Sequence, residues 1–324
     1  MQPRTEGLPE ALDRAVRGLE ALGPWPAGTR AGLACSGGAD STLLALAWRR
    51  FAQGRPLEAR VWVVDHGHRP GTEREAARAA ALYRGLGFRA EVLRAEPPVR
   101  GSSVTEGALR EARYEALFQA ARASAATVLL TAHQADDCAE TVLLRILRGT
   151  GLRGLAGIPA RRELFPESGI EVRRPLLGLR RAAIRRALEA LGQAWIRDPT
   201  NEVAATGARN RLRLELLPLL SGLAPGDPVQ AVLRLAGEAG EWKEALEELL
   251  ASAGDWRALP SFLRRQAIAT KLRETGETVS PARLRDLEEA LLARGSAAIS
   301  RTRRLRCPAA GGALEVRPHK AGPD

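Results

Sequence analysis

The sequence predicts an α/β protein: a doubly wound parallel sheet followed by a smaller, mostly helical C-terminal domain. Short apolar, β-branched runs alternate with longer helical patterns through the first two-thirds of the 324 residues. Such alternation is typical of β-α-β units and a parallel sheet. The turn-rich segment Ser221–Pro228 then interrupts the pattern, and helical patterns prevail after it. We therefore expect two domains, residues 1–220 and residues 221–324.

The first domain should contain strands and helices in strict alternation. The strand candidates are short and apolar: Ala31–Cys35, Ala59–Val64, Arg89–Leu93, Thr127–Thr131 and, as a fifth strand, Ala194–Ile196. The helical candidates lie between and after them: Thr42–Gln53, Glu73–Leu86, Glu106–Ala123, Asp136–Leu147 and Arg180–Leu191. Right-handed crossovers would place helices on both faces of the sheet.

The second domain is expected to be helical with a small hairpin at its end. Helical patterns run over Val229–Leu250, Pro260–Glu274 and Pro281–Ala293. Pro281 directly after Ser280 is typical of a helix start. Ser300–Cys307 and Ala313–Val316, joined through Gly311-Gly312, predict the hairpin.

Composition and cysteine usage indicate a cytoplasmic protein. Hydrophobic residues make up 45% and charged residues 27% of the chain, which is typical of a globular protein. No apolar run approaches 18 residues, so we expect no membrane association, and residues 1–10 lack a signal-peptide pattern. Three cysteines without a C-x-x-C pair favour a reducing compartment. The oligomeric state is undetermined, with a homodimer among the assemblies allowed.

The net charge of +11 is concentrated in two segments. Fifteen arginines and six acidic residues lie between Arg145 and Arg213, and seven basic residues and one acid lie between Arg294 and Lys320. Such segments favour a polyphosphate partner bound with counterion release. An arginine-rich solvated surface is the alternative, and charge alone does not decide between them.

A glycine turn, Ser36–Ser41, stands between the first expected strand and the helix after it. Main-chain N–H groups at such a turn bind anions, and Gly37 and Gly38 let phosphate oxygens approach the backbone. Asp40 would repel a bare phosphate, so we expect it to hold Mg²⁺. A chance serine-glycine turn is the alternative reading. No G-x-x-x-x-G-K-[ST] motif occurs, which argues against the usual γ-phosphate transfer.

In this context S-G-G-x-D-S resembles the PP-loop of the N-type ATP pyrophosphatases. The resemblance implies that ATP is cleaved between its α- and β-phosphates to activate a carbonyl oxygen as an adenylate. It implies nothing about the substrate.

Three carboxylates begin the helix after the fourth expected strand. Asp136 and Asp137 each share a helix face with Glu140 by spacing, in the turns where the helix dipole favours negative charge. Near the glycine turn they could bind Mg²⁺ or an ammonium group, whereas the alternative is ordinary charge at a helix start. We expect His133 to orient Asp137.

Two further groups are candidates for the nucleotide pocket. Arg110 and Arg113 lie one turn apart and could hold phosphate oxygens, although a solvated helix face is the alternative. Asp65 and His66 follow the second strand, where we expect a pocket wall with Asp65 near the ribose. His66 and His68 at i and i+2 are weak evidence for a metal site.

Further segments resemble the tRNA(Ile)-lysidine synthetases in order and spacing. These segments are Val64–Arg69, Glu106–Tyr114, Thr131–Thr141, Arg148–Leu155, Asp198–Asn201 and Arg209–Arg211. Together with the glycine turn they span about residues 30–220. The chain departs from the family pattern at His68, Gln134 and Cys138, where leucine, histidine and glutamine are expected.

The resemblance implies a ligase that uses ATP and Mg²⁺ to adenylylate the wobble cytidine of CAU-anticodon tRNA(Ile) and joins L-lysine to C2, releasing AMP and pyrophosphate. Residues expected to bind ATP are Ser36, Gly37, Gly38, Ala39, Asp40, Ser41, Asp65 and His66. Expected catalytic residues are Asp40, Arg113, Asp137 and Glu140. Residues expected to contact lysine or tRNA are Arg110, His133, Asp136, Asp137, Glu140, Arg209 and Arg211. The C-terminal arginines 301, 303, 304 and 306 would hold the tRNA body.

Three alternatives stay open at this stage. A tRNA thiolation enzyme would share the loop but usually needs paired or persulfide cysteines, and Cys35 and Cys138 are single. A small-molecule amidating ligase like NAD synthetase would not need the basic segments. A non-catalytic RNA-binding protein would not need to keep Ser36–Ser41 beside an acidic helix.

Overall fold

The computed structural model describes residues 9–67, 71–96, 106–197, 207–223, 225–277, 279–300, 302–307 and 314–318. Two compact units divide the chain, Met1–Gly240 and Glu241–Asp324. The boundary lies beyond residue 220 because Val229 and Val232 pack into the core of the first unit. The functional division into residues 1–220 and 221–324 stays a prediction. The motif at residues 198–201, His68 and Arg301 lie outside the described residues.

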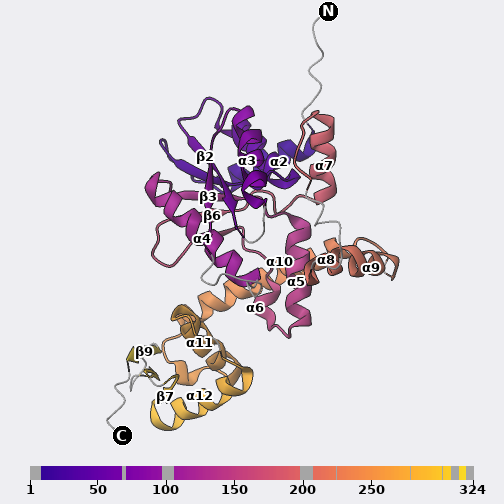
Figure 1. The fold of residues 1–324 in the computed structure, drawn as a ribbon. Helices are drawn as coiled ribbons and strands as arrows, with labels where there is room; N and C mark the ends of the chain where they lie inside the picture. The colour runs from indigo at the N-terminus through magenta and orange to yellow at the C-terminus, as the bar shows by residue number, and fades with distance from the viewer. Residues whose placement is uncertain are drawn as a thin grey trace, which may run out of the picture. The chain divides into compact units, whose positions relative to one another are not determined.

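The first unit is built on a six-stranded, mostly parallel sheet, which confirms the predicted fold class (Figure 1). In spatial order its strands are β3 (Arg89–Arg94), β2 (Glu58–Asp65), β1 (Arg30–Ala34), β4 (Val128–Thr131), β6 (Glu171–Arg173) and β5 (Arg161–Glu163). Only β5 runs antiparallel, to β6. The first four strands lie within one residue of their predicted bounds.

The predicted strand Ala194–Ile196 was wrong. That segment has no regular structure, and the main-chain N–H of Ile196 donates to Gly37 O at 2.9 Å. The place beside β4 is taken by β6, in parallel register with it. β5 and β6 have three residues each, which is too short to give a periodic pattern in the sequence.

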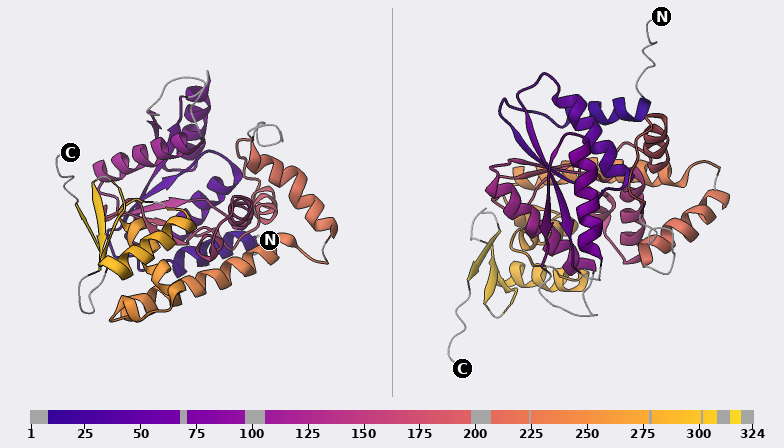
Figure 2. Two further views of the ribbon diagram at one scale, coloured as in Figure 1. Left: turned by 90° about the horizontal axis from the view of Figure 1, so that it is seen from below. Right: turned by 45° about the horizontal axis from the view of Figure 1, so that its top comes forward.

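Helices cover both faces of the sheet (Figures 1 and 2). The helices on one face share a core: α1 (Glu10–Ala21), α2 (Ala39–Ala52), α3 (Thr72–Gly85) and α7 (Arg181–Ala190). α4 (Glu106–Ala123) packs on the other face, against Trp62, Leu129 and Val172. The chain builds β1, β2 and β3 outward and then crosses to β4 on the other side of β1. In doubly wound sheets, ligands bind outside the carboxyl ends of the strands at such a reversal, which here lies between β1 and β4.

A helical layer completes the first unit beyond β4. Its elements are α5 (Ala135–Leu147), α6 (Leu152–Leu155), α8 (Ala208–Arg211), the π-helix η3 (Leu212–Leu216), α9 (Leu217–Leu223) and the first part of α10 (Pro228–Ser252). Ala139 of α5 packs with Leu212, Leu217 and Val229. This contact brings Arg209 and its neighbours to α5. The described residues of the expected linker, Ser221–Pro228, thus form the end of α9, a turn and the start of α10.

The second unit combines helices with a three-stranded antiparallel sheet. Its elements after α10 are η4 (Trp256–Ala258), α11 (Ser261–Glu274), α12 (Pro281–Arg294), β7 (Ser296–Ala298), β8 (Arg303–Arg306) and β9 (Glu315–Pro318). Ser280 caps α12 by accepting from Arg283 N at 3.2 Å. The hairpin pairing of β8 with β9 is confirmed, and β7 adds a strand to it. Among the described residues, no helix has the length and apolarity that a membrane crossing requires.

Candidate functional site

The turn Ser36–Ser41 leaves β1 and begins α2, as predicted. Gly37 has a φ of +85°, and a Cβ there would lie 2.9 Å from the Ile196 side chain, so only glycine fits without strain. No side chain caps the start of α2. The first N–H groups of a helix have no intrahelical partner, and residues 39–41 therefore offer donors to an anion at the carboxyl edge of the sheet.

Tyr83 of α3 holds this turn from behind and was missed by sequence reasoning. Its hydroxyl accepts from Gly37 N at 3.1 Å and donates to Ser41 Oγ at 2.9 Å. The ring is fully buried, and burial raises the pKa of the phenol. Gly37 N–H is thus used inside the protein rather than left for a ligand. A tyrosine on the buried face of an alanine-rich helix was the available signal, because a buried hydroxyl needs a partner.

Asp40 is the residue of the turn that best suits a cation. Its Oδ1 is buried and has no hydrogen-bond partner among the described residues. Burial chiefly, and then the nearby Asp137 carboxylate, raise the pKa of Asp40 to about 6 against the opposing charges of Arg181 and Arg185. In the described part of the chain, no group of three His, Cys, Asp or Glu side chains could hold a metal ion. A cation at Asp40 would therefore need further ligands from a bound phosphate or water.

The acidic start of α5 lies close enough to Asp40 for their charges to interact. Gln134 caps the helix: its Oε1 accepts from Asp136 N at 2.6 Å, while Asp137 Oδ2 accepts from Gln134 N at 3.1 Å. The cap, rather than His133, orients Asp137. The Nδ1 atom of His133 lies 2.9 Å from Thr131 Oγ1. Burial, together with nearby arginines, lowers the pKa of His133 to about 2, so the ring is neutral.

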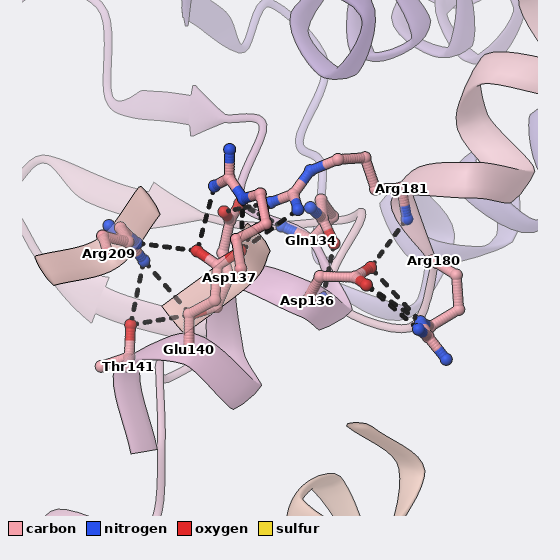
Figure 3. Close-up of polar contacts among 9 residues, drawn as sticks. Gln134, Asp136, Asp137, Glu140, Thr141, Arg180, Arg181 and Arg209 are labelled. Atoms are coloured by element: carbon pink, nitrogen blue, oxygen red, sulfur yellow. Dashed lines mark hydrogen bonds and ion pairs between the residues drawn. The ribbon is translucent and has the colours of Figure 1, made fainter. Parts of the chain in front are cut away.

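Arginines pair with the three carboxylates that sequence reasoning grouped together. Figure 3 shows Asp136, Asp137 and Glu140 with the guanidinium groups of Arg180, Arg181 and Arg209. Asp136 accepts from Arg180 Nη2 at 3.1 Å and from the main chain of Arg181 at 2.8 Å. Arg181 Nη2 donates to Asp137 Oδ1 at 3.1 Å and to Glu140 Oε1 at 3.1 Å, so it bridges two carboxylates.

Glu140 is fully buried and its acceptor sites are occupied. Arg181, Arg209 and Arg213 all donate to it, the last two through Nε at 2.9 Å. A carboxylate offers about four lone-pair sites, and five N–H groups already point at this one. The arginine excess between residues 145 and 213 was the sequence signal for these partners, although it did not say which arginines would be used.

Arg209 and Arg211, two expected tRNA contacts, have different surroundings. Arg209 also donates to Asp137 O and Thr141 Oγ1, so its guanidinium is engaged within the protein. Arg211 is exposed and forms an i,i+4 pair with Glu215 at 3.2 Å. An exposed pair of this kind yields readily to a stronger partner.

Asp65 and His66 lie at the end of β2, beside β1 and on the same edge of the sheet. Although burial acts to raise the pKa of Asp65, hydrogen bonds from Thr72 and from Gly67 N outweigh it and lower the pKa. Asp65 is thus held as an ionised carboxylate at the carboxyl edge of the sheet, where a ribose hydroxyl could reach it.

Arg110 and Arg113 lie on α4, across β4 from the glycine turn. Both guanidinium groups lie over the ring of Tyr114, at 5.2 and 5.3 Å from its centroid. Neither forms an ion pair with a described carboxylate, in contrast to the arginines around α5.

Comparison with known proteins places these features in a family. A model described as a PP-loop domain matches residues 14–220. The tRNA(Ile)-lysidine synthase of Pseudomonas aeruginosa is 41% identical over 251 residues, which are 76% of this chain and 54% of that protein. The synthase of Nocardia farcinica is 40% identical over 278 residues, 82% of each chain. This chain thus spans about half the length of the Pseudomonas relative.

Among solved structures, a U34-tRNA thiolase from Methanococcus maripaludis is similar with a TM-score of 0.58 and 15% identity, over 71% of this chain and 80% of that one. At this identity the likeness concerns the fold alone.

Proposed function

This chain belongs to the PP-loop family and, within it, to the tRNA(Ile)-lysidine synthases, and we propose that it is a ligase acting on tRNA. It adenylylates the wobble cytidine of CAU-anticodon tRNA(Ile) with ATP and joins L-lysine to C2 of that base. The observation that carries the proposal is the proximity of Asp40, in the turn, to Asp137, in the acidic helix start.

ATP is proposed to lie on the turn, with its phosphates against the free main-chain N–H groups of residues 39–41. Asp40 would hold Mg²⁺, since its buried Oδ1 lacks a partner. When bound, Mg²⁺ neutralises charge on the phosphates. Asp65 and His66 would form the wall on the nucleoside side, and Ser36 and Ser41 the floor of the turn.

In the first step the cytosine O2 attacks the α-phosphorus of ATP, giving an adenylylated base and pyrophosphate. In the second step the ε-amine of lysine attacks C2, and AMP leaves. Negative charge builds on the phosphates and is met by fixed donors, among which we place Arg113. Asp137 is the carboxylate best placed to take the ammonium proton before attack.

Lysine binding at Asp137 and Glu140 requires a rearrangement of Arg181. This guanidinium bridges both carboxylates, so the ammonium group of lysine takes over its contacts. Asp137 can then face the substrate directly, whereas Glu140 keeps its contacts to Arg209 and Arg213. Arg211, on the surface, is the better candidate for the anticodon loop.

The wobble base must unstack from the anticodon loop to reach the site, and a single-stranded loop permits this. The exposed Arg304 and Arg306 of β8 are proposed to contact the tRNA body. We place the enzyme in the cytoplasm, and a homodimer is the assembly to test by light scattering.

Thiolation is the second candidate function, and the described residues favour it less. Cys35, Cys138 and Cys307 are all buried, and burial raises the pKa of the Cys35 thiol to about 12. A thiol held protonated is a poor nucleophile or sulfur carrier.

The test is incorporation of radiolabelled lysine into CAU-anticodon tRNA(Ile) with ATP, alongside ATP–pyrophosphate exchange. We expect label in that tRNA and none in a tRNA whose wobble base is uridine. ATP–pyrophosphate exchange without lysine incorporation would contradict the lysine step and favour thiolation, which uses a sulfur donor. RNA binding without exchange would instead indicate a non-catalytic binder.

A further inference from the structure

A second group of arginines surrounds Tyr114 on the α4 side of the sheet. The guanidinium carbons of Arg110, Arg113 and Arg162 lie 5.2, 5.3 and 5.0 Å from the centre of its ring. Arg174, directly after β6, is 3% exposed, and its positive charge contributes to lowering the pKa of the Tyr114 phenol. These four arginines and the tyrosine come from α4, β5 and the end of β6, which lie far apart in the sequence. We refer to them as the Tyr114 cluster.

The Tyr114 cluster has donors without acceptors. Arg113 Nε, Arg174 Nε and the Tyr114 hydroxyl are buried and form no hydrogen bond of ordinary geometry with the described residues. Within the same part of the chain, none of the four guanidinium groups forms an ion pair with a carboxylate. Buried polar groups are nearly always satisfied in native proteins, and guanidinium groups can only donate. Among the described residues these donors lack an acceptor, and a bound anion would supply one.

The charges of the cluster agree with this geometry. Burial chiefly, with Arg110 adding to it, lowers the pKa of Arg113, and burial lowers that of Arg174. Burial alone would raise the pKa of Tyr114, but Arg113, Arg110 and Arg174 outweigh it and bring the pKa to about 8. The lowered pKa of Tyr114 therefore reflects the positive charge of the arginines around its hydroxyl.

We propose that Arg113, Tyr114 and Arg174 form an oxyanion site that binds phosphate oxygens, separate from the turn Ser36–Ser41. The planar guanidinium fork matches two phosphate oxygens at once. Arg110 is exposed and Arg113 half-buried, so the site opens to solvent on α4 and closes on Arg174. Several cations in one place suit pyrophosphate or successive RNA backbone phosphates rather than a single carboxylate.

This inference rests in part on the proposed function, because Arg113 is also placed among the donors to the ATP phosphates, and it adds Tyr114 and Arg174 as further phosphate contacts. β6 lies beside β4, and α4 packs on the face opposite α2. The cluster therefore lies across β4 from the glycine turn, at the same carboxyl edge of the sheet. Pyrophosphate leaving the turn and an RNA strand approaching that edge are the two sources of the phosphate.

The matched variants are Arg174→Met and Arg173→Met. The two arginines are neighbours and both buried, but Arg173 donates to Glu171 and to Pro24 O, whereas Arg174 Nη1 donates to Pro159 O and its Nε has no partner among the described residues. Tyr114→Phe removes only the hydroxyl. Binding of inorganic pyrophosphate is measured by calorimetry with the turn filled by a non-hydrolysable ATP analogue, and binding of an anticodon stem-loop RNA is measured in parallel.

We expect Arg174→Met to weaken phosphate binding about ten- to hundredfold, and Tyr114→Phe about threefold, because one charge-assisted and one neutral hydrogen bond are lost. Arg173→Met should leave the affinity unchanged. Loss confined to pyrophosphate identifies the leaving group as the source, and loss confined to RNA identifies the backbone phosphate.

Equal affinity in wild type and Arg174→Met for both ligands would overturn the proposal, as would equal losses in Arg174→Met and Arg173→Met. Thermal unfolding of the ligand-free Tyr114→Phe variant guards against misfolding, since removing an unpartnered hydroxyl should not lower its Tm. Failure of the wild type to incorporate lysine would count against the ligase function and leave this result intact.

Discussion

Two arginine groups lie at one edge of the same sheet and differ in their partners. Around α5, Arg180, Arg181, Arg209 and Arg213 each contact a carboxylate of Asp136, Asp137 or Glu140. Around Tyr114, the described arginines contact no carboxylate. Removing one member of a buried ion pair is costly, so the α5 group is held in place. The Tyr114 cluster keeps its donors for an outside anion. Counting arginines therefore says little until their acceptors are known.

The α5 group should respond most strongly when its central carboxylate is lost. Glu140→Gln removes a fully buried carboxylate and leaves three half-buried arginines without their charged partner, and it should lower the free energy of unfolding by about 3–5 kcal/mol. Urea denaturation measures this change. As a control, Glu215→Gln removes an exposed partner of Arg211 and should cost about 0.5 kcal/mol or less. Equal effects of the two substitutions would show that Glu140 is not the centre of the group.

Asp137→Asn separates binding of lysine from binding of RNA. The amide keeps an oxygen that can accept from Gln134 N, but it can neither pair with an ammonium group nor take its proton. We expect lysine incorporation to fall about a hundredfold or more, with unchanged tRNA affinity. Asp227→Asn, at a carboxylate that pairs with Arg180, is the control and should retain incorporation. Full activity of Asp137→Asn would remove its proposed role.

The pKa of Asp40 tests how close the turn lies to the acidic start of α5. Its pKa of about 6 in the folded protein lies above the ordinary value of 3.8, so the native state binds the proton more tightly than the unfolded chain. Without Mg²⁺, the free energy of unfolding should therefore rise as the pH falls through about 6 and level off near about 4. Asp40→Asn should remove this rise.

Carbon-13 NMR titration gives the companion result. Because Asp137 contributes to the raised pKa, Asp137→Asn should bring the pKa of Asp40 closer to 3.8. An unchanged pKa would mean that the two carboxylates do not interact.

The smallest expected effect concerns two arginines of the second unit that form no ion pair with a described residue. Arg304→Gln and Arg306→Gln, both on exposed positions of β8, should each reduce the salt slope of tRNA binding by about 1. Arg303→Gln is the comparison, since Arg303 already pairs with Glu277 and with Thr275 O. If none of the three substitutions changed the salt slope of tRNA binding, these arginines of β8 would not contact tRNA phosphates.

Local chemistry made the turn and the acidic helix predictable from sequence. The residue types of Gly37, Gly38 and Asp40, together with the apolar strand before them, were enough to predict an anion-binding turn that carries a carboxylate. The first four strands followed from runs of buried apolar residues. β6 could not be predicted in this way, because three residues are too few to show a periodic pattern. Ala194–Ile196 is apolar for a different reason, since Ile196 packs against the turn at Gly37.

The missed residues share one property, which is that their role depends on contacts far away in sequence. Tyr83 reaches the turn from α3, and Arg174 reaches Tyr114 from the end of β6. Arg181 and Arg213 are indistinguishable from their neighbours until the fold brings them to Glu140. Charge counts placed these arginines in a basic segment but could not sort paired from unpaired ones.

A crystal structure with a non-hydrolysable ATP analogue and lysine tests most directly whether the turn and α5 form one site. We expect the phosphates against the main-chain N–H groups of residues 39–41, with the α-phosphorus on the side facing Asp137 and the lysine ammonium in place of the Arg181 guanidinium. A nucleotide bound away from Ser36–Ser41, or lysine bound out of reach of Asp137, would contradict the account.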